Sequence, residues 1–255
     1  MIKYLLLSVC LSVLIFLQGQ AQKKDTSILH HEDLRPLPER TISFSGYKWT
    51  VRNTAGKQGP GPNYFGDYSA FLDDSGYLHL WIRKDKLSGQ WQCAEVTSLQ
   101  SFEYGTYKFV VEGAIDKFDK NLVLGLFNYS GNDGLDEMDI EIARWGNASY
   151  PNLNYTIWPA KKEFKNSSTV KEFELNSNLS THYFMRNADT VICASFNGIS
   201  TDPKDEIFSS TFASPTASIS HLAMPVHINF WLFNAEPPAD QANVEVVIRS
   251  FKYIP

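Results

Sequence analysis

This sequence of 255 residues has few cysteines and only a small excess of charge of one sign. The 23 Lys and Arg against 28 Asp and Glu leave a net charge of −5, and no basic stripe stands out, so we expect no nucleic-acid partner. Beyond Cys10, only Cys93 and Cys193 occur, both among apolar residues. An exported protein could join them in a disulfide. Because the sequence gives no distance between them, two buried free thiols stand as the alternative.

Long hydrophobic runs are missing after the N-terminus. The run over residues 4–17 spans about 14 residues, short of the roughly 20 that a membrane helix needs, so no membrane span is expected. Lys3 precedes this run and the segment QGQAQ follows it, which is the order of a secretory signal peptide. We predict cleavage after Ala21 and a secreted or periplasmic protein. A lipoprotein acylated at Cys10 is the weaker alternative, because the apolar run continues past that residue.

Helical periodicity over ten or more residues is also absent after the signal peptide. Turn signals recur about every ten residues, and runs rich in β-branched and aromatic residues lie between them, for example at residues 77–83, 104–113 and 244–254. This spacing predicts an all-β sandwich of two antiparallel sheets. No repeat or low-complexity linker divides the chain, so we expect a leader over residues 22–40 and a single domain over residues 41–255.

A dense group of carboxylates is present in the segment DEMDIEIARWG, residues 136–146. Side chains at i, i+2 and i+4 of a strand share one face, so Glu137, Asp139 and Glu141 would lie together, with apolar residues on the opposite face. Crowding like charges raises the pKa of each neighbour. Such a strand is either a solvated acidic face or a site that uses carboxyl groups in different protonation states.

Metal and serine chemistry fit this segment poorly. NYSGNDGLDEMD departs from the EF-hand calcium template, and no His or Cys pair lies nearby at zinc-ligand spacing. The chain has no G-x-S-x-G motif. Acid/base cleavage of a glycosidic bond needs two carboxyl groups, about 5–5.5 Å apart in retaining enzymes. Because Cα atoms at i and i+2 of a strand are about 6.6 Å apart, backbone spacing alone favours adjacent members as that pair.

The motif EMDIE resembles the E-x-D-x-E strand of glycoside hydrolase family 16, the laminarinase and lichenase type. Further segments resemble that family in the expected order over roughly residues 45–255. They are WQCAEVTSLQSFEYGTYKFVVEG (91–113), NLVLGLFNYSGNDGLDEMDIEIARWG (121–146), HINFWLFNAEPP (227–238) and VEVVIRSFKYIP (244–255). The resemblance implies a β-jelly roll of two curved antiparallel sheets, with a substrate cleft on the concave face.

By this resemblance the reaction would be retaining, endo-acting hydrolysis of a β-linked polysaccharide of the β-glucan or β-galactan type. Glu137 would be the nucleophile, Glu141 the general acid and then base, and Asp139 would hydrogen-bond and tune the nucleophile. No cofactor is required, although some relatives bind a structural calcium whose ligands cannot be assigned here. We expect a monomer. A non-catalytic sugar-binding module and a transglycosylase are the alternatives, since one fold hosts several functions.

Sugar contacts are predicted from the resemblance and from alternation. Asn154, Thr156 and Trp158 share one face of the next expected strand and match family positions that touch sugars, although Trp158 could instead be a core residue. Arg144 and Trp145 would lie at the rim. Residues 48–67 begin as a strand and become a Gly/Pro-rich loop, a type that is often functional. Asn63 and Phe65 in this loop, and Trp231, are further candidates for the cleft, weighed against packing roles. The Trp that often precedes the first Glu in the family is absent here, which leaves the polysaccharide undetermined.

Overall fold

The computed structural model describes residues 39–255. The predicted signal peptide, Cys10 and nearly all of the predicted leader lie outside these residues. Within them, the regular elements are the predicted strands, together with short 3-10 turns. The strands are β1 (Arg40–Phe44), β2 (Tyr47–Val51), β3 (Tyr64–Phe65), β4 (Ala70–Leu72), β5 (Leu78–Lys84), β6 (Trp91–Phe102), β7 (Gly105–Glu112), β8 (Leu122–Tyr129), β9 (Glu137–Ala143), β10 (Leu153–Trp158), β11 (Ser167–Lys171), β12 (Leu179–Arg186), β13 (Thr190–Asn197), β14 (Glu206–Ala213), β15 (Met224–Leu232) and β16 (Val244–Ile254).

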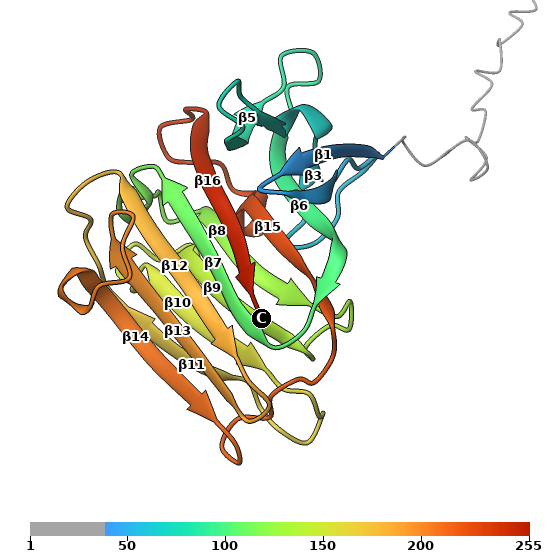
Figure 1. Ribbon diagram of the computed structural model, residues 1–255. Helices are drawn as coiled ribbons and strands as arrows, with labels where there is room; N and C mark the ends of the chain where they lie inside the picture. Colours follow the sequence, from blue (N-terminus) through green and yellow to red (C-terminus); the bar gives the residue numbers. More distant parts are fainter. Residues whose placement is uncertain (1–38) are drawn as a thin grey trace, which may run out of the picture. The chain divides into compact units, whose positions relative to one another are not determined.

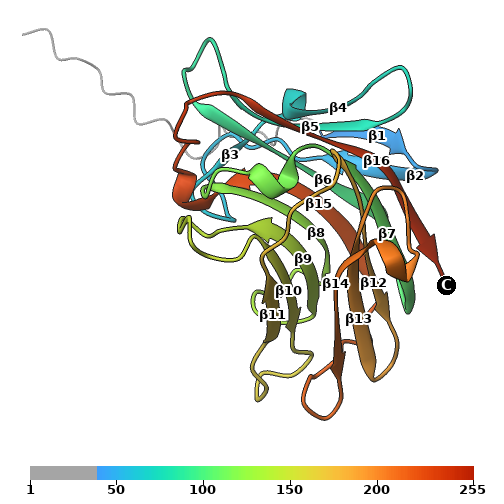
Figure 2. The same cartoon turned by 90° about the vertical axis from the view of Figure 1, so that its left-hand side faces the viewer.

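The strands form two curved antiparallel layers that face each other (Figures 1 and 2). One layer, called the β9 sheet, has the order β11-β10-β9-β8-β15-β6-β2-β1. The other, called the β12 sheet, has the order β14-β13-β12-β7-β16-β5-β4. A short β5–β6 pairing joins them, and the two-residue β3 pairs with β6 in parallel. The predicted all-β jelly-roll sandwich is therefore confirmed.

The core lies between the two sheets and is built by strand alternation. Met138, Ile140 and Ile142 of β9 are fully buried and point toward the β12 sheet, which contributes Phe109 and Phe184. Burying each such side chain contributes about 1.5–3 kcal/mol, which fixes the register of β9. A slip by one residue would turn the carboxylates into this core, so the apolar face determines where the acidic face points.

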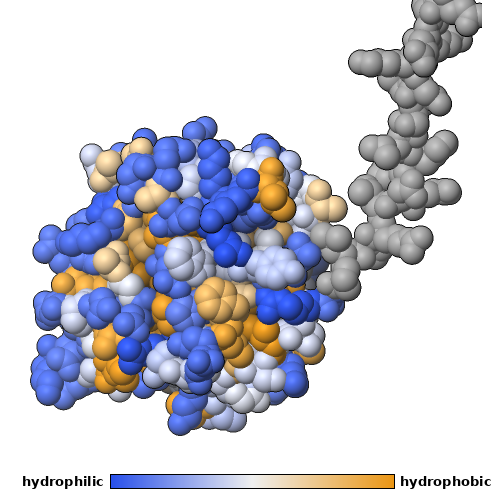
Figure 3. All heavy atoms as spheres, turned by 90° about the horizontal axis from the view of Figure 1, so that it is seen from above, coloured by the Kyte–Doolittle hydropathy of each residue, from blue (hydrophilic) through white to orange (hydrophobic). Residues whose placement is uncertain are grey.

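Cys93 of β6 and Cys193 of β13 are both free and fully buried. The disulfide interpretation is therefore wrong, and the interpretation as buried thiols is confirmed. Burial raises the pKa of the Cys93 thiol to about 12, so it stays protonated. Within residues 39–255, no helix is long and apolar enough to cross a membrane. The face drawn in Figure 3 is mostly hydrophilic, with smaller hydrophobic areas between.

Candidate active site

The acidic face of β9 lies on the outer side of the β9 sheet, and neighbouring strands align other side chains with it. Glu141 pairs with Asn154 of β10 and, on its other side, with Gly125 of β8. Gly125 pairs with Asn229 of β15, which in turn pairs with Glu95 of β6. Because paired residues of adjacent strands point to the same face, these side chains form a row that crosses the strands.

Two further rows run parallel to the first. Asp139 lies between Thr156 of β10 and Phe127 of β8, and Phe127 pairs with His227 of β15. Glu137 lies between Trp158 of β10 and Tyr129 of β8. The rows place groups from four strands beside the three carboxylates.

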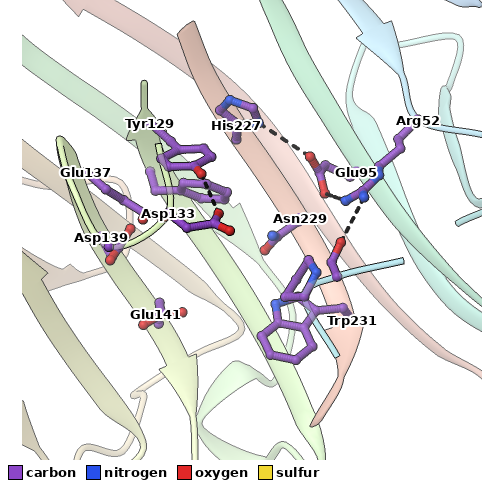
Figure 4. A pocket seen from close by; sticks show the side chains of 14 residues that line it. Arg52, Glu95, Tyr129, Asp133, Glu137, Asp139, Glu141, His227, Asn229 and Trp231 are labelled. Atoms are coloured by element: carbon purple, nitrogen blue, oxygen red, sulfur yellow. Dashed lines mark hydrogen bonds and ion pairs between the residues drawn. The ribbon is translucent and has the colours of Figure 1, made fainter. Parts of the chain in front are cut away.

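The carboxylates separate two hollows in this face, of about 610 Å³ and about 340 Å³, and line both of them. The larger hollow lies over β8, β15 and the start of β6 (Figure 4). Its other lining residues are Arg52, Gly59, Pro60, Glu95, Phe127, Tyr129, Asp133, Gly134, His227, Asn229 and Trp231. The smaller hollow lies over β10 and β11 and is lined by Trp145, Tyr150, Asn154, Thr156, Trp158, Asn166, Ser168 and Val170. Together they form a cleft that continues on both sides of β9.

The carboxyl groups of β9 resist ionisation. Burial, followed by the charge of Glu137, raises the pKa of Glu141 to about 8. Burial is also the main cause that raises the pKa of Glu137 to about 7, while a hydrogen bond with Asp139 acts in the opposite direction. Burial and the two neighbouring glutamates hold the pKa of Asp139 well above its ordinary value. With a pKa of about 7 against about 8, Glu137 ionises before Glu141 as the pH rises, and Asp139 is also held toward its protonated form.

The carboxyl group of Asp139 connects the indole of Trp158 with the carboxyl group of Glu137. Its side chain is only 4% exposed, and its Oδ2 accepts a hydrogen bond of 2.9 Å from Nε1 of Trp158. It also shares a hydrogen bond with Glu137. Two carboxyl groups can share a hydrogen bond only if one of them carries the proton. This bond lowers the pKa of Glu137 and raises the pKa of Asp139, which favours a proton on Asp139 and a charge on Glu137.

A second charged group lies across the larger hollow, opposite the carboxylates (Figure 4). Arg52 Nη1 donates to Glu95 Oε2 over 2.7 Å, and His227 Nδ1 lies 3.0 Å from Thr97 Oγ1 and 3.4 Å from Glu95 Oε1. Burial opposes the charge of Glu95, but the His227 hydrogen bond and the Arg52 charge outweigh it and keep the pKa of Glu95 low. The His227 ring stacks on Phe127 at 5.0 Å between ring centroids. Glu95 is therefore an ionised, paired carboxylate.

Several of the predicted sugar contacts line this cleft. Asn154, Thr156 and Trp158 share the outer face of β10, and Trp231 lines the larger hollow. Trp145 lines the smaller hollow, donates from Nε1 to Asn154 Oδ1 over 3.2 Å, and lies 6.2 Å from Trp231 between ring centroids. The structure places these residues on one common surface, and their contacts with sugar remain predictions.

For two other predicted contacts, Phe65 and Asn63, the alternative of a packing role holds. Phe65 is fully buried in the core, with the Arg52 guanidinium 4.1 Å from its ring centroid. Asn63 is 3% exposed and uses Nδ2 to hold the carbonyls of Pro60 and Leu232, which fixes the Gly/Pro-rich loop. Arg144 pairs with Glu172 and with the carbonyl of Tyr150, which itself lines the smaller hollow, so its place at the rim stays a prediction.

Seven residues of the larger hollow come from other strands and loops and were not predicted from the sequence. They are Arg52, Glu95, Phe127, Tyr129, Asp133, His227 and Asn229. A signal for two of them was present: His227 and Asn229 alternate with Trp231 and so share its face of β15. Glu95 had a weaker signal, as the one charged residue of the strand β6.

Metal binding has no separate site in the described part of the chain. Over residues 39–255, no group of three or more His, Cys, Asp or Glu side chains is arranged to hold a metal ion. What the cleft offers chemically is a protonated carboxyl group and an ionised one on the same strand face, with aromatic side chains on both sides.

No protein-family model matches the sequence, and no curated protein matches it. Solved structures do resemble it. A β-glucanase of Bacillus licheniformis has a TM-score of 0.61 at 14% identity, covering 87% of this chain and 100% of its own. A family 16 endo-glucanase of Bacteroides ovatus has a TM-score of 0.59 at 11% identity, covering 81% and 94%. A structure described as a pseudo β-1,3-glucanase of Mycobacterium tuberculosis has a TM-score of 0.59 at 14% identity, covering 79% and 88%. The chain therefore has the jelly-roll fold of the family 16 glycoside hydrolases.

Proposed function

We propose that this chain, which has the fold of the family 16 glycoside hydrolases, is itself an exported, retaining, endo-acting hydrolase of a β-linked polysaccharide. The observation that carries this proposal is the placement of Glu137, Asp139 and Glu141. They share one strand face, are largely withdrawn from water and lie between two hollows. Withdrawal from water is what allows neighbouring carboxyl groups to hold different protonation states at one pH.

The proposed reaction assigns one role to each carboxyl group. Ionised Glu137 attacks the anomeric carbon, while protonated Glu141 donates its proton to the leaving glycosidic oxygen. This gives a glycosyl-enzyme ester and a free chain end. Glu141, now ionised, then takes a proton from water, which attacks the ester and releases Glu137. The chemistry needs only these carboxyl groups and water, so no cofactor is part of the proposal.

The shape of the cleft supports attack within a chain. The carboxylates are flanked by the larger hollow on one side and the smaller on the other. A polysaccharide can therefore occupy both sides of the bond that is cut. Trp231 and Phe127 in the larger hollow, and Trp145 and Trp158 in the smaller, present aromatic surface of the kind that packs against the apolar C–H faces of sugar rings.

Charge in the cleft favours a neutral polysaccharide. Glu95, Asp133 and the three carboxyl groups of β9 line the two hollows. Among the described residues lining them, only Arg52 and His227 can carry positive charge, and both contact Glu95. A sulfate or uronate group would meet carboxylates with no unpaired cation to offset them. A neutral β-glucan or β-galactan fits this surface better than a sulfated galactan.

A sugar-binding module is the alternative from another class. The observation that favours this alternative is the likeness to a structure described as a pseudo β-1,3-glucanase. A module has no need for several carboxyl groups withdrawn from water in its binding face, because each is costly to bury. A transglycosylase would use the same groups and resolve the intermediate with a sugar hydroxyl.

A polysaccharide panel tests the proposed function. The mature protein is incubated with laminarin, barley mixed-linkage β-glucan, agarose and sulfated κ-carrageenan, and new reducing ends and product sizes are measured. We expect internal cuts in one or more of the three neutral chains and none in κ-carrageenan. Binding to a neutral chain without any new ends would support the module, and products longer than the starting oligosaccharides would indicate transglycosylation. Cleavage of κ-carrageenan would contradict the electrostatic argument.

Gly125 is a position where one methyl group should reduce this activity. A Cβ added there would lie 2.4 Å from Oδ1 of Asn229, which leans over the glycine in the row beside Glu141. The backbone at Gly125 is compatible with alanine, so the effect would come from displacing the Asn229 amide into the cleft. We expect Gly125→Ala to lower kcat/KM about tenfold, equivalent to about 1.4 kcal/mol of transition-state binding. Initial rates on the substrate identified by the panel measure this.

Gly56→Ala is the matched control, because a Cβ at Gly56 meets nothing within 4 Å. We expect wild-type rates from this variant. A Gly125→Ala protein as active as the control would show that the amide of Asn229 has no influence on the reaction.

A further inference from the structure

Trp158 makes a contact that a sugar-stacking role does not explain. It is the last residue of β10 and pairs with Glu137 across the strands. Its side chain lies on the same face as the carboxyl groups, and its indole N–H points at Oδ2 of Asp139 over 2.9 Å. The donor of the indole is therefore committed to the central carboxyl group and is not free for a sugar hydroxyl.

This contact restricts where the proton of Asp139 can sit. An indole N–H can only donate, so the oxygen that it meets must act as an acceptor. A proton on Asp139 is then favoured on Oδ1, since Oδ2 already accepts from the indole. Asp139 also shares a hydrogen bond with Glu137. Because Asp139 is only 4% exposed, water does not compete effectively for either oxygen.

We propose that Trp158 is a positioning residue that directs the proton of Asp139 onto Glu137 and so keeps Glu137 ionised as the nucleophile. This inference rests on the proposed function. The indole N–H donates to Asp139 Oδ2, and a proton on the other oxygen of Asp139 would serve the hydrogen bond with Glu137. Without the indole, the proton could occupy either oxygen of Asp139, and Glu137 would lose part of the hydrogen bond that favours its charged form.

Replacing Trp158 would leave the other titratable groups around Glu137 and Asp139 unchanged. They are Glu141 on β9, Tyr129 at the end of β8, Asp133 in the loop after β8, His227 on β15, and Cys193 in the β12 sheet. On this face β10 presents only the neutral Asn154, Thr156 and Trp158. Replacing the indole by a phenyl ring thus removes one hydrogen bond and no charge.

Trp158→Phe separates the role in positioning Asp139 from a role in stacking on sugar. The variant keeps an aromatic face and removes only the N–H. If Trp158 positions Asp139, kcat should fall about tenfold while KM stays within about twofold of wild type. The acidic limb of kcat/KM should move to higher pH, because Glu137 becomes easier to protonate. A sugar-stacking role alone predicts wild-type kcat and an unmoved limb, and that result would overturn the inference. Trp81→Phe is the matched control, since Trp81 Nε1 has no hydrogen-bond partner among the described residues.

A measurement that does not depend on turnover completes the test. Protein labelled with ¹³C at glutamate carboxyl carbons is titrated by NMR, and the Glu137 signal is assigned from its loss in Glu137→Gln. We expect the Glu137 titration to move up by about half a pH unit or more in Trp158→Phe and to stay in place in Trp81→Phe. An unmoved titration in an enzyme that cleaves the panel would overturn the inference and leave the proposed function standing. A Glu137 titration that moves in a protein unable to cleave any member of the panel would uphold the inference about Trp158 and overturn the proposed function.

Discussion

Glu137→Gln is expected to abolish glycoside cleavage, with a loss in kcat of more than roughly 10³-fold. The amide has nearly the same shape as the carboxylate, but it cannot form the glycosyl ester. The measurement is the rate at which new reducing ends appear on the substrate that the panel identifies. Glu174→Gln is the control, because the Glu174 side chain is 84% exposed and outside the cleft. Glu137→Gln activity equal to that of this control would disprove the proposed mechanism.

The same variant should be more stable than wild type at neutral pH, which would exclude misfolding as the cause of its inactivity. Burial raises the pKa of Glu137 from its ordinary value of 4.5 to about 7, so the folded state binds this proton more strongly than the unfolded state. That penalty is absent below about pH 4.5, grows as the pH rises toward 7 and is complete above it. We expect Glu137→Gln to increase the free energy of unfolding by about 1–3 kcal/mol at pH 8, and by much less at pH 4. Urea unfolding at the two pH values measures this difference.

Glu141→Ala is expected to slow the enzyme in a way that depends on the leaving group. A natural sugar leaving group needs its oxygen protonated, so its release should slow by about 10²–10⁴-fold. An aryl leaving group of low pKa needs little protonation, so formation of the glycosyl-enzyme should remain close to wild type. Comparing the natural polysaccharide with activated aryl glycosides of the same sugar sequence measures this difference. An equal loss on all substrates would count against Glu141 as the acid.

The pH dependence of activity tests the role of Glu141 independently. In wild type, activity should fall below about pH 7 as Glu137 becomes protonated, and above about pH 8 as Glu141 loses its proton. On aryl substrates, Glu141→Ala should lose the alkaline limb and keep the acidic one. An alkaline limb that persists in this variant would assign it to another group.

Much of the site could be predicted because strand alternation is a local property. Glu137, Asp139 and Glu141 lie two residues apart, so the pattern places them on one face before any partner strand is known. The apolar residues between them indicate which face is buried, and the structure confirms this. Strand alternation also correctly predicted that Asn154, Thr156 and Trp158 share one face of β10.

Strand alternation gives no direction to side chains where the chain leaves regular strands. Phe65 and Asn63 belong to or border the two-residue β3, and Arg144 follows the end of β9. In such segments the direction of a side chain is determined by tertiary contacts, which are core packing for Phe65 and hydrogen bonds for Asn63 and Arg144. Asn63 turns inward because two backbone carbonyls need a donor, and Arg144 turns toward Glu172. A pattern of residue types contains neither piece of information.

The sequence by itself determined the all-β class, the shared face of the three carboxyl groups and the resemblance to family 16, because each depends on neighbouring residues or on the order of short motifs. Only the tertiary structure decided which groups stand beside those carboxyl groups. Glu95, Gly125 and Asn229 come from three strands far apart in the chain, and hydrogen-bonded register alone brings them into one row with Glu141. The protonation of the site was decided there as well, since a carboxyl group is made to hold its proton by the packing that excludes water from it.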